Sequence, residues 1–173
     1  MLNLRSEQAL DHDAIAAVVV DAFNPQHGPE VAALVERIRA SEHYVPELAL
    51  VAEDESGIVG HVMLSWVGLE GGTRDRILCL SPLAVRPDRQ RTGVGGRLVE
   101  AVLERAEQAG EPAVFLEGIP DYYPRFGFEL ASSLGFLPPK EGIPDAAFLI
   151  RRLTAYDPAI AGRVVYPEAF DGL

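Results

Sequence analysis

The chain has 173 residues, 48% of them apolar and 24% charged, a composition typical of one globular domain with a sizeable core. Its formal net charge of −11 disfavours a nucleic-acid partner, because attraction to phosphate needs a basic face. The single cysteine, Cys79, excludes an intrachain disulfide and a cysteine-rich zinc cluster. Since no apolar run is long enough for a bilayer and no signal-peptide pattern is present, we expect a cytoplasmic protein with no membrane partner.

The first half of the chain predicts a strand, two helices and a meander of three strands. These elements fall at residues 3–6, 11–23, 29–40, 47–52, 58–67 and 76–85. Apolar residues recur at helical spacing in the two helices. Asp54-Glu55-Ser56-Gly57 and Gly71-Gly72 are typical turn sequences between the strands of the meander.

The second half predicts a long helix, a strand, a short helix and a final strand. The long helix begins at Thr92 or Gly93 and ends at Ala109, where Gly110 terminates it. The other elements fall at residues 113–116, 122–126 and 146–153. The strand at 113–116 is wholly apolar, as expected for one buried on both faces. A meander followed by a helical crossover implies a mixed sheet with helices on its faces.

A segment rich in glycine and arginine joins the strand that ends at Val85 to the long helix. Arg86, Arg89, Arg91 and Arg97 lie within twelve residues of an otherwise acidic chain. A helix start exposes unpaired amides, and the helix dipole favours an anion there. The glycines at 93, 95 and 96 carry no Cβ that would keep a ligand away from the backbone. We therefore predict that residues 91–96 wrap a diphosphate and that nearby arginines meet further phosphates.

Two other phosphate loops are excluded by their sequence patterns. The segment contains no G-x-x-x-x-G-K-[ST], the loop of nucleoside-triphosphate sites. It also lacks G-x-G-x-x-G followed by an acidic ribose ligand, the pattern of dinucleotide sites. A glycine turn that serves only close packing of helix on strand remains an alternative.

The segment resembles the acetyl-CoA motif of the GNAT-type N-acetyltransferases, V-x-P-x-x-Q/R-x-x-G-x-G/A. Every position is matched, by Val85, Pro87, Gln90, Gly93 and Gly95. Residues 122–128, Y-Y-P-R-F-G-F, resemble the family's Y-x-x-x-G-F segment and are most similar to a bacterial branch of predicted acetyltransferases.

The resemblance implies an α/β (α+β) fold with a mixed, splayed central sheet of about six or seven strands and helices on both faces. Residues 1–153 would form the N-acetyltransferase domain, and residues 154–173 a C-terminal extension packed on it. Within that extension, residues 162–166 predict either an edge strand or a cover over the substrate cleft. Members of this fold often form homodimers.

The resemblance also implies acetyl-CoA as cosubstrate and no metal. The sheet of the family opens between its fourth and fifth strands, here 76–85 and 113–118, and the pantetheine arm lies in that opening. The Leu83 amide would donate to the thioester carbonyl, a role that needs no particular side chain. The cofactor-binding residues implied are Leu83, Ala84, Val85, Gln90, Arg91, Thr92, Gly93, Val94, Gly95, Gly96, Arg97 and Tyr123.

Proton transfer is predicted less directly. The tyrosine of the family's Y-x-x-x-G-F segment often serves as general acid, here Tyr123, with a packing role as the alternative. Several members place a glutamate on the fourth strand where this chain has Ser81, which is no credible base at neutral pH. Glu117, at the end of the fifth strand, is one substitute and a water relay to a distant carboxylate is another. A solvent-exposed Glu117 with no catalytic role is the simpler alternative.

The function expected is direct transfer of the acetyl group of acetyl-CoA to a primary amine of a small molecule or peptide. Two alternatives stay open: transfer to a protein amino group, and a catalytically silent acyl-CoA-binding sensor or regulator. The departure at Ser81 keeps the sensor in consideration.

Overall fold

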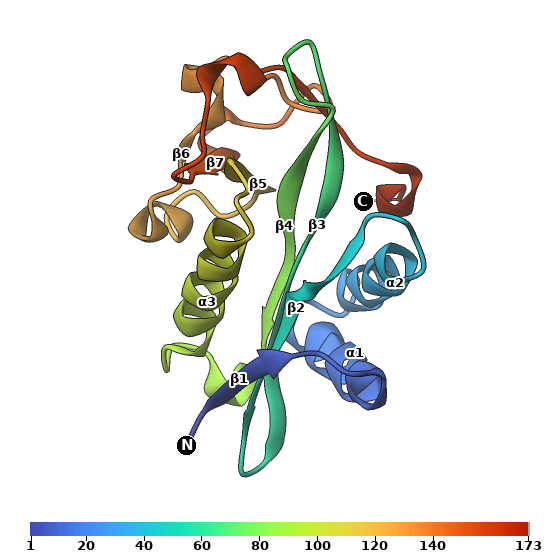
Figure 1. Ribbon diagram of the computed structural model, residues 1–173. Coiled ribbons are helices and arrows are strands. Elements are labelled where there is room, and N and C mark those ends of the chain that lie inside the picture. The colour runs from blue at the N-terminus through green and yellow to red at the C-terminus, as the bar shows by residue number, and fades with distance from the viewer. Residues whose placement is uncertain (173) are drawn as a thin grey trace.

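A single sheet of eight strands, mostly antiparallel, forms the centre of the protein (Figure 1). The computed structural model describes residues 1–172. Its strands are β1 (Asn3–Ser6), β2 (Tyr44–Asp54), β3 (Gly57–Glu70), β4 (Arg76–Val85), β5 (Ala113–Glu117), β6 (Glu129–Leu130), β7 (Phe148–Arg152) and β8 (Arg163–Val165). Their order in the sheet is β1-β2-β3-β4-β5-β7-β6, and β8 pairs with the far end of β3.

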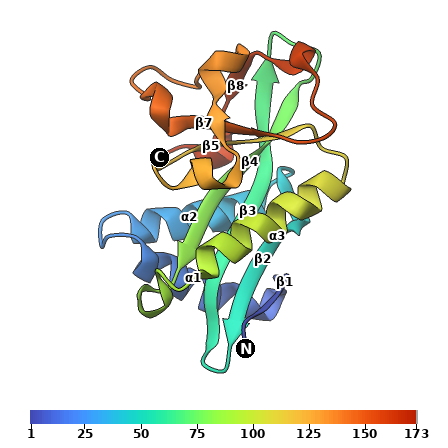
Figure 2. The same ribbon diagram turned by 90° about the vertical axis from the view of Figure 1, so that its left-hand side faces the viewer.

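Helices cover both faces of this sheet. They are α1 (His12–Ala22), α2 (Gly28–Arg39) and α3 (Val94–Gln108). Figures 1 and 2 show α1 and α2 on one face and α3 on the other. Alternate side chains of each strand serve the two faces: Val114 of β5 packs in the cluster that includes α3, and Phe115 packs in the cluster that includes α2. None of the helices in residues 1–172 is long and apolar enough to span a membrane.

The sheet opens between β4 and β5, the two neighbouring strands that run parallel. They are paired at only two positions, Leu78 with Val114 and Cys79 with Phe115. Beyond Cys79, β4 continues to Val85 paired with β3 alone, while β5 continues alongside β7. The splayed sheet that the resemblance implies is therefore present, and one edge of β4 is left without a strand partner.

Most predicted elements are confirmed, with differences at short or irregular segments. The sheet has eight strands instead of six or seven, because β6 and β8 are added. Strand β2 begins at Tyr44, three residues before the predicted start. The predicted short helix at 122–126 is a 3₁₀ turn, η3 (Tyr123–Phe126), since Pro124 interrupts regular hydrogen bonding. Residues 163–165 do form an edge strand, opposite Gly68–Glu70 of β3.

A buried charged cluster connects the end of β1 to α2, β2 and β3. The Glu7 carboxylate accepts hydrogen bonds from Arg39 at 2.7 Å and from the Tyr44 hydroxyl at 2.7 Å. The His61 Nε2 atom lies 3.5 Å from a Glu7 oxygen, an electrostatic contact without hydrogen-bond geometry. Burial raises the pKa of Glu7, but His61, Arg39 and Tyr44 together lower it by more, to about 2. The carboxylate is therefore ionised at neutral pH and binds four elements together.

Candidate functional site

The start of α3 presents backbone amides that have no acceptor within the helix. The first bond of the helical ladder runs from the Arg97 amide to the Gly93 carbonyl, at 3.1 Å. The amides of residues 94–96 precede that bond and are free for a ligand. The chain turns into the helix through two residues with left-handed backbone, Arg91 at φ 62° and Gly93 at φ 92°, and only the glycine adopts it without steric cost. This geometry suits an anion at the helix start.

Two side chains hold the turn before α3 in shape. The Gln90 Nε2 atom donates to the Val85 carbonyl at 2.9 Å. The Thr92 hydroxyl donates to the Arg89 carbonyl at 2.5 Å. The motif glutamine thus closes the loop onto the end of β4, and its contact with a ligand stays a prediction.

The four arginines around this turn divide into two pairs. Arg86 lies 2.6 Å from Asp88, and Arg89 lies 2.8 Å from Asp54. Arg91 and Arg97 are exposed and form no ion pair with any residue that the structure describes. The positive charge available to an anion at the helix start therefore comes from Arg91 and Arg97, and Arg86 and Arg89 mainly fix the loop.

The open edge of β4 exposes backbone groups of alternate residues. The Arg86 amide donates to the Val59 carbonyl of β3 at 2.8 Å, and Ala84 is opposite His61. Because alternate residues of an antiparallel strand face the same partner, Ala84 bonds to β3, whereas Leu83 and Val85 point their backbone groups away from it. No strand of residues 1–172 lies on that side of Leu83. Its amide and carbonyl are thus available at the opening of the sheet.

The two adjacent tyrosines of η3 have different surroundings. A Cβ placed on Gly95 would lie 2.8 Å from the Tyr122 hydroxyl, so Tyr122 borders the start of α3. Tyr123 packs over Gly118, just beyond β5, with its ring 5.6 Å from that of Phe128. Burial raises the pKa of Tyr123, and Tyr122 and Cys79 add to the effect. Tyr123 is therefore a protonated donor at neutral pH.

On the opposite face, where β4 and β5 separate, lies a pocket of about 190 Å³. It is lined by Cys79, Leu80, Ser81, Glu117, Lys140, Tyr166 and Phe170. The predicted residues Ser81 and Glu117 are thus brought together, while Tyr123 packs in the cluster of the α3 face. The Tyr166 hydroxyl donates to the Glu117 carboxylate at 2.9 Å. Sequence reasoning did not identify Tyr166, for which the only signal was the edge-strand pattern at 162–166.

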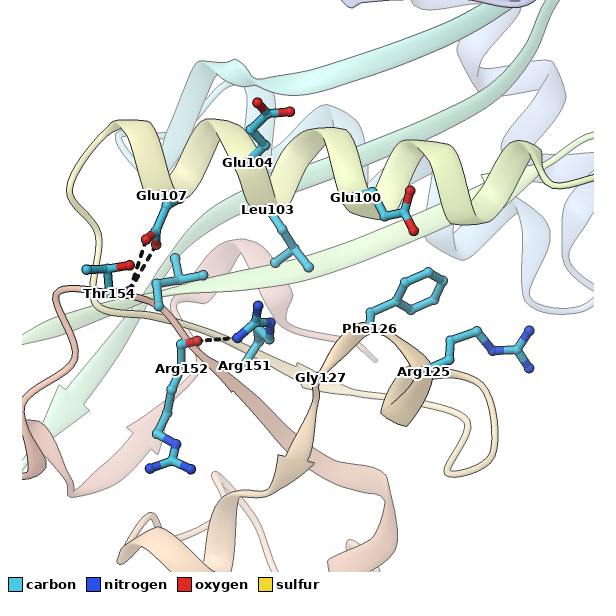
Figure 3. A pocket seen from close by; sticks show the side chains of 11 residues that line it. Glu100, Leu103, Glu104, Glu107, Arg125, Phe126, Gly127, Arg151, Arg152 and Thr154 are labelled. Carbon is cyan, nitrogen blue, oxygen red and sulfur yellow. Dashed lines mark hydrogen bonds between the residues drawn. The ribbon is translucent and has the colours of Figure 1, made fainter.

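A larger hollow of about 740 Å³ lies beside the C-terminal half of α3 (Figure 3). Acidic side chains of α3 line one side of it, and Arg125, Arg151 and Arg152 line the other. Glu107 accepts a bond from the Thr154 amide at 3.0 Å, which ties α3 to the chain after β7. The hollow includes none of the residues at the open edge of β4, so we assign the chemistry to the smaller pocket.

Known proteins share both the sequence and the architecture. Residues 45–130 match the family model described as Acetyltransferase (GNAT) domain. The chain is 34% identical over 135 residues to the uncharacterized N-acetyltransferase YjhQ of Escherichia coli K12, covering 76% of this chain and 75% of YjhQ. The E. coli GNAT family N-acetyltransferase YhbS, solved in complex with CoA, superposes with TM-score 0.86 and 31% identity, covering 98% of this chain and 91% of YhbS.

A second solved structure extends the similarity over the full length. A GNAT family acetyltransferase from Brucella melitensis, in complex with acetyl-CoA, gives TM-score 0.79 at 29% identity and covers 99% of both chains. The motif at residues 85–95, the opening of the sheet after Cys79 and the similarity to these relatives all indicate the same family. The chain belongs to the GNAT family of N-acetyltransferases.

Proposed function

We propose that this protein transfers the acetyl group of acetyl-CoA directly to a primary amine of a small molecule or peptide. The observation that carries the proposal is the arrangement around β4. A helix start with unpaired amides lies on one face of the sheet, a pocket lined by a carboxylate lies on the other, and the unpaired edge of β4 lies between them. The CoA and acetyl-CoA in the two solved relatives support this cosubstrate.

The residues at the helix start suit the diphosphate of acetyl-CoA. The amides of Val94, Gly95 and Gly96 would donate to its oxygens, and Arg91 and Arg97 would offset its charge. Glycine is required at position 95 because the Tyr122 hydroxyl lies beside it, and a side chain there would collide with that hydroxyl and hinder the diphosphate from reaching the helix start. Ala84, Gln90, Thr92 and Gly93 complete the proposed binding segment by shaping its backbone.

The edge of β4 suits the pantetheine arm and the thioester. Amides and carbonyls of Leu83 and Val85 point to the open side, although the Val85 carbonyl is shared with Gln90. The Leu83 amide would donate to the thioester oxygen, where negative charge develops during attack.

The reaction requires two proton movements. The amine nitrogen forms a bond to the acetyl carbon, the carbon–sulfur bond breaks with its electron pair on sulfur, and one amine proton must leave. In the proposed mechanism Glu117 accepts that proton, and Tyr123 gives its phenolic proton to the thiolate. The Ser81 hydroxyl, in the same pocket as Glu117, would hydrogen-bond the incoming amine.

Titration calorimetry with acetyl-CoA, followed by thiol release over a panel of primary amines, tests the function. We expect binding and turnover by the wild type. Glu117→Gln should keep the acetyl-CoA affinity and lose about 100-fold in kcat, because the amine proton has no acceptor. Glu100→Gln, an exposed change on α3, is the matched control and should keep the wild-type rate.

The other outcomes separate the alternatives. Acetyl-CoA binding without release on any amine supports the silent sensor, and turnover on protein substrates alone supports a protein acetyltransferase. Absence of acetyl-CoA binding overturns every version. A cytoplasmic location and a homodimer remain predictions of the sequence.

A further inference from the structure

The pocket at the separation of β4 and β5 has one wall from the far C-terminal part of the chain. Strand β8 pairs with Gly68–Glu70, and the buried Val164 fixes it there. The 3₁₀ turn η7 (Glu168–Phe170) then returns toward α2. Arg37 of α2 donates to the Ala169 carbonyl at 2.9 Å and to the Asp171 carbonyl at 3.1 Å. This segment is therefore attached at both ends, and its side chains form a defined surface.

Two aromatic rings make that surface. Tyr166 and Phe170 are stacked, with ring centroids 5.0 Å apart and an interplanar angle of 11°. Tyr166 also lies 6.3 Å from the Phe115 ring of β5. Phe170 is 4% exposed and Tyr166 is partly buried. Together the two rings form an aromatic wall of the pocket.

The Glu117 carboxylate, at the end of β5, lines the same pocket and contacts Tyr166. The Tyr166 hydroxyl donates a hydrogen bond to the Oε2 atom of Glu117, and the Oε1 atom of Glu117 accepts no hydrogen bond from residues 1–172. The other ionisable groups that line the pocket are the Cys79 thiol of β4 and Lys140 of the loop before β7. Burial raises the pKa of Cys79, and the Glu117 charge raises it further, so the thiol is neutral. One carboxylate oxygen is thus held by Tyr166, and the Glu117 side chain, which is solvent-exposed, lines the pocket.

The volume limits what can enter. Pockets for drug-sized ligands measure roughly 300–1,000 Å³, and this one measures about 190 Å³. That space suits a single compact molecule better than an extended polyamine or a folded peptide segment. Leu80, Phe170 and the ring of Tyr166 supply its apolar surface, and its polar groups come from Cys79, Ser81, Glu117, Lys140 and the Tyr166 hydroxyl.

We infer that this pocket is the acceptor site for a compact primary amine with an apolar body. Tyr166 is a positioning residue that orients Glu117 toward the amine, and Phe170 is a specificity-determining residue that limits the size of the acceptor. The inference rests on the proposed acetyl transfer. The amine nitrogen would bond to the acetyl carbon as its proton passes to Glu117 Oε1, and the coenzyme would leave as the thiol.

The first test concerns the size of the acceptor. Wild-type protein is assayed for thiol release with propylamine and 2-phenylethylamine as compact amines, and with spermidine and a lysine-containing hexapeptide as large ones. We expect a preference for the compact amines of at least about tenfold in kcat/KM. Phe170→Ala should shift the ratio toward the large amines by about tenfold, and Phe170→Leu by less. Circular dichroism and acetyl-CoA calorimetry check that each variant is folded.

The second test concerns Tyr166. Tyr166→Phe should lower kcat roughly tenfold and leave the KM for acetyl-CoA unchanged, because one hydrogen bond to a charged group is lost. Tyr156→Phe is the matched control, since Tyr156 lies on the same C-terminal segment but packs over Arg152, away from the pocket. The control should keep the wild-type kcat.

The outcomes distinguish this inference from the proposed function. A protein that binds no acetyl-CoA defeats both. The inference alone is overturned if only the large amines react, if large amines react as well as compact ones, or if Phe170→Ala leaves the ratio unchanged. A wild-type kcat in Tyr166→Phe also overturns it.

Discussion

At the scale of single residues, environment decides which tyrosine can transfer a proton. Tyr122 and Tyr123 are adjacent, yet Tyr122 faces the helix start and Tyr123 faces the end of β5. Burial keeps the pKa of Tyr123 above its usual range, so the phenol stays protonated at neutral pH and can donate to negative charge that develops on the leaving sulfur. The ordinary pKa of a thiol lies much closer to that of a phenol than the pKa of a carboxylic acid does, so sulfur is a better proton acceptor here than a carboxylate.

Replacement of Tyr123 by Phe should therefore affect turnover and not binding. We expect kcat to fall about 100-fold while the KM for acetyl-CoA stays within about twofold. Steady-state thiol release measures both constants. The control is Tyr122→Phe, in which kcat should change far less. If Tyr123→Phe works as fast as the wild type, its role is packing only.

Residues also show the limit of sequence reasoning at the site. Gly93 and Gly95 are recognisable because a helix start that binds an anion needs glycine nearby. Ser81 and Glu117 are recognisable because the resemblance to the GNAT family implies an opening of the sheet near both residues and a catalytic glutamate at the position of Ser81. Tyr166 is separated from Glu117 by 49 residues, and nothing local marks one tyrosine as its partner. Only the folded chain brings the two together.

At the scale of elements, the buried Glu7 cluster joins the N-terminal strand to α2 and the centre of the sheet. The Glu7 and Arg39 side chains are 1% and 8% exposed. Removal of one partner leaves an uncompensated charge in the interior, which is more costly than loss of a surface pair. The cluster therefore links the stability of the helical face to pH.

Stability should fall on acidification through the titration of Glu7. Its pKa is lowered from 4.5 in the unfolded chain to about 2 in the folded one, so its stabilising contribution is present above pH 4.5 and lost between about 4.5 and 2. Glu7→Gln should cost about 3 kcal/mol at pH 7 because Arg39 stays buried without its carboxylate.

Urea midpoints from pH 7 to pH 2 measure this dependence. The gap between wild type and Glu7→Gln should narrow as the pH falls toward 2. Glu100→Gln, an exposed change, is the control and should follow the wild type throughout. A constant gap over the whole range would contradict the proposed linkage.

Long, regular elements were predictable and short ones were not. Periodicity located α1, α2, α3 and the meander to within a few residues, since each buries a continuous apolar stripe. Strand β6 has two residues, Glu129 and Leu130, too few for any pattern. The early start of β2 at Tyr44 was missed because Pro46, which precedes the predicted start, is disfavoured inside a strand. These segments depend on neighbours that only the completed sheet supplies.

At the scale of the whole molecule, the pocket depends on contacts between distant parts of the chain. Arg37, on α2, holds the carbonyls of Ala169 and Asp171, more than 130 positions later. Phe170 lies between these two and forms the pocket wall. An N-terminal helix thus helps to fix a C-terminal wall.

Loss of the Arg37 contacts should loosen that wall without changing the cofactor side of the sheet. We expect Arg37→Ala to lower kcat/KM for the amine about fivefold, since two exposed hydrogen bonds contribute modestly. The acetyl-CoA affinity from calorimetry should stay the same. Arg37→Lys keeps the charge but not the paired geometry and should give an intermediate value. An equal fall in acetyl-CoA affinity would show that the effect is global destabilisation.

The open edge of β4 has a consequence for tolerance to substitution. In the proposed mechanism the polarised oxygen is held by the main chain at Leu83, and every amino acid but one supplies the same hydrogen there. If Leu83 is replaced by each of the other amino acids in turn, variants with side chains of similar size should keep nearly normal activity, and the proline variant should lose it. A position central to the chemistry would pass unnoticed in an alanine screen.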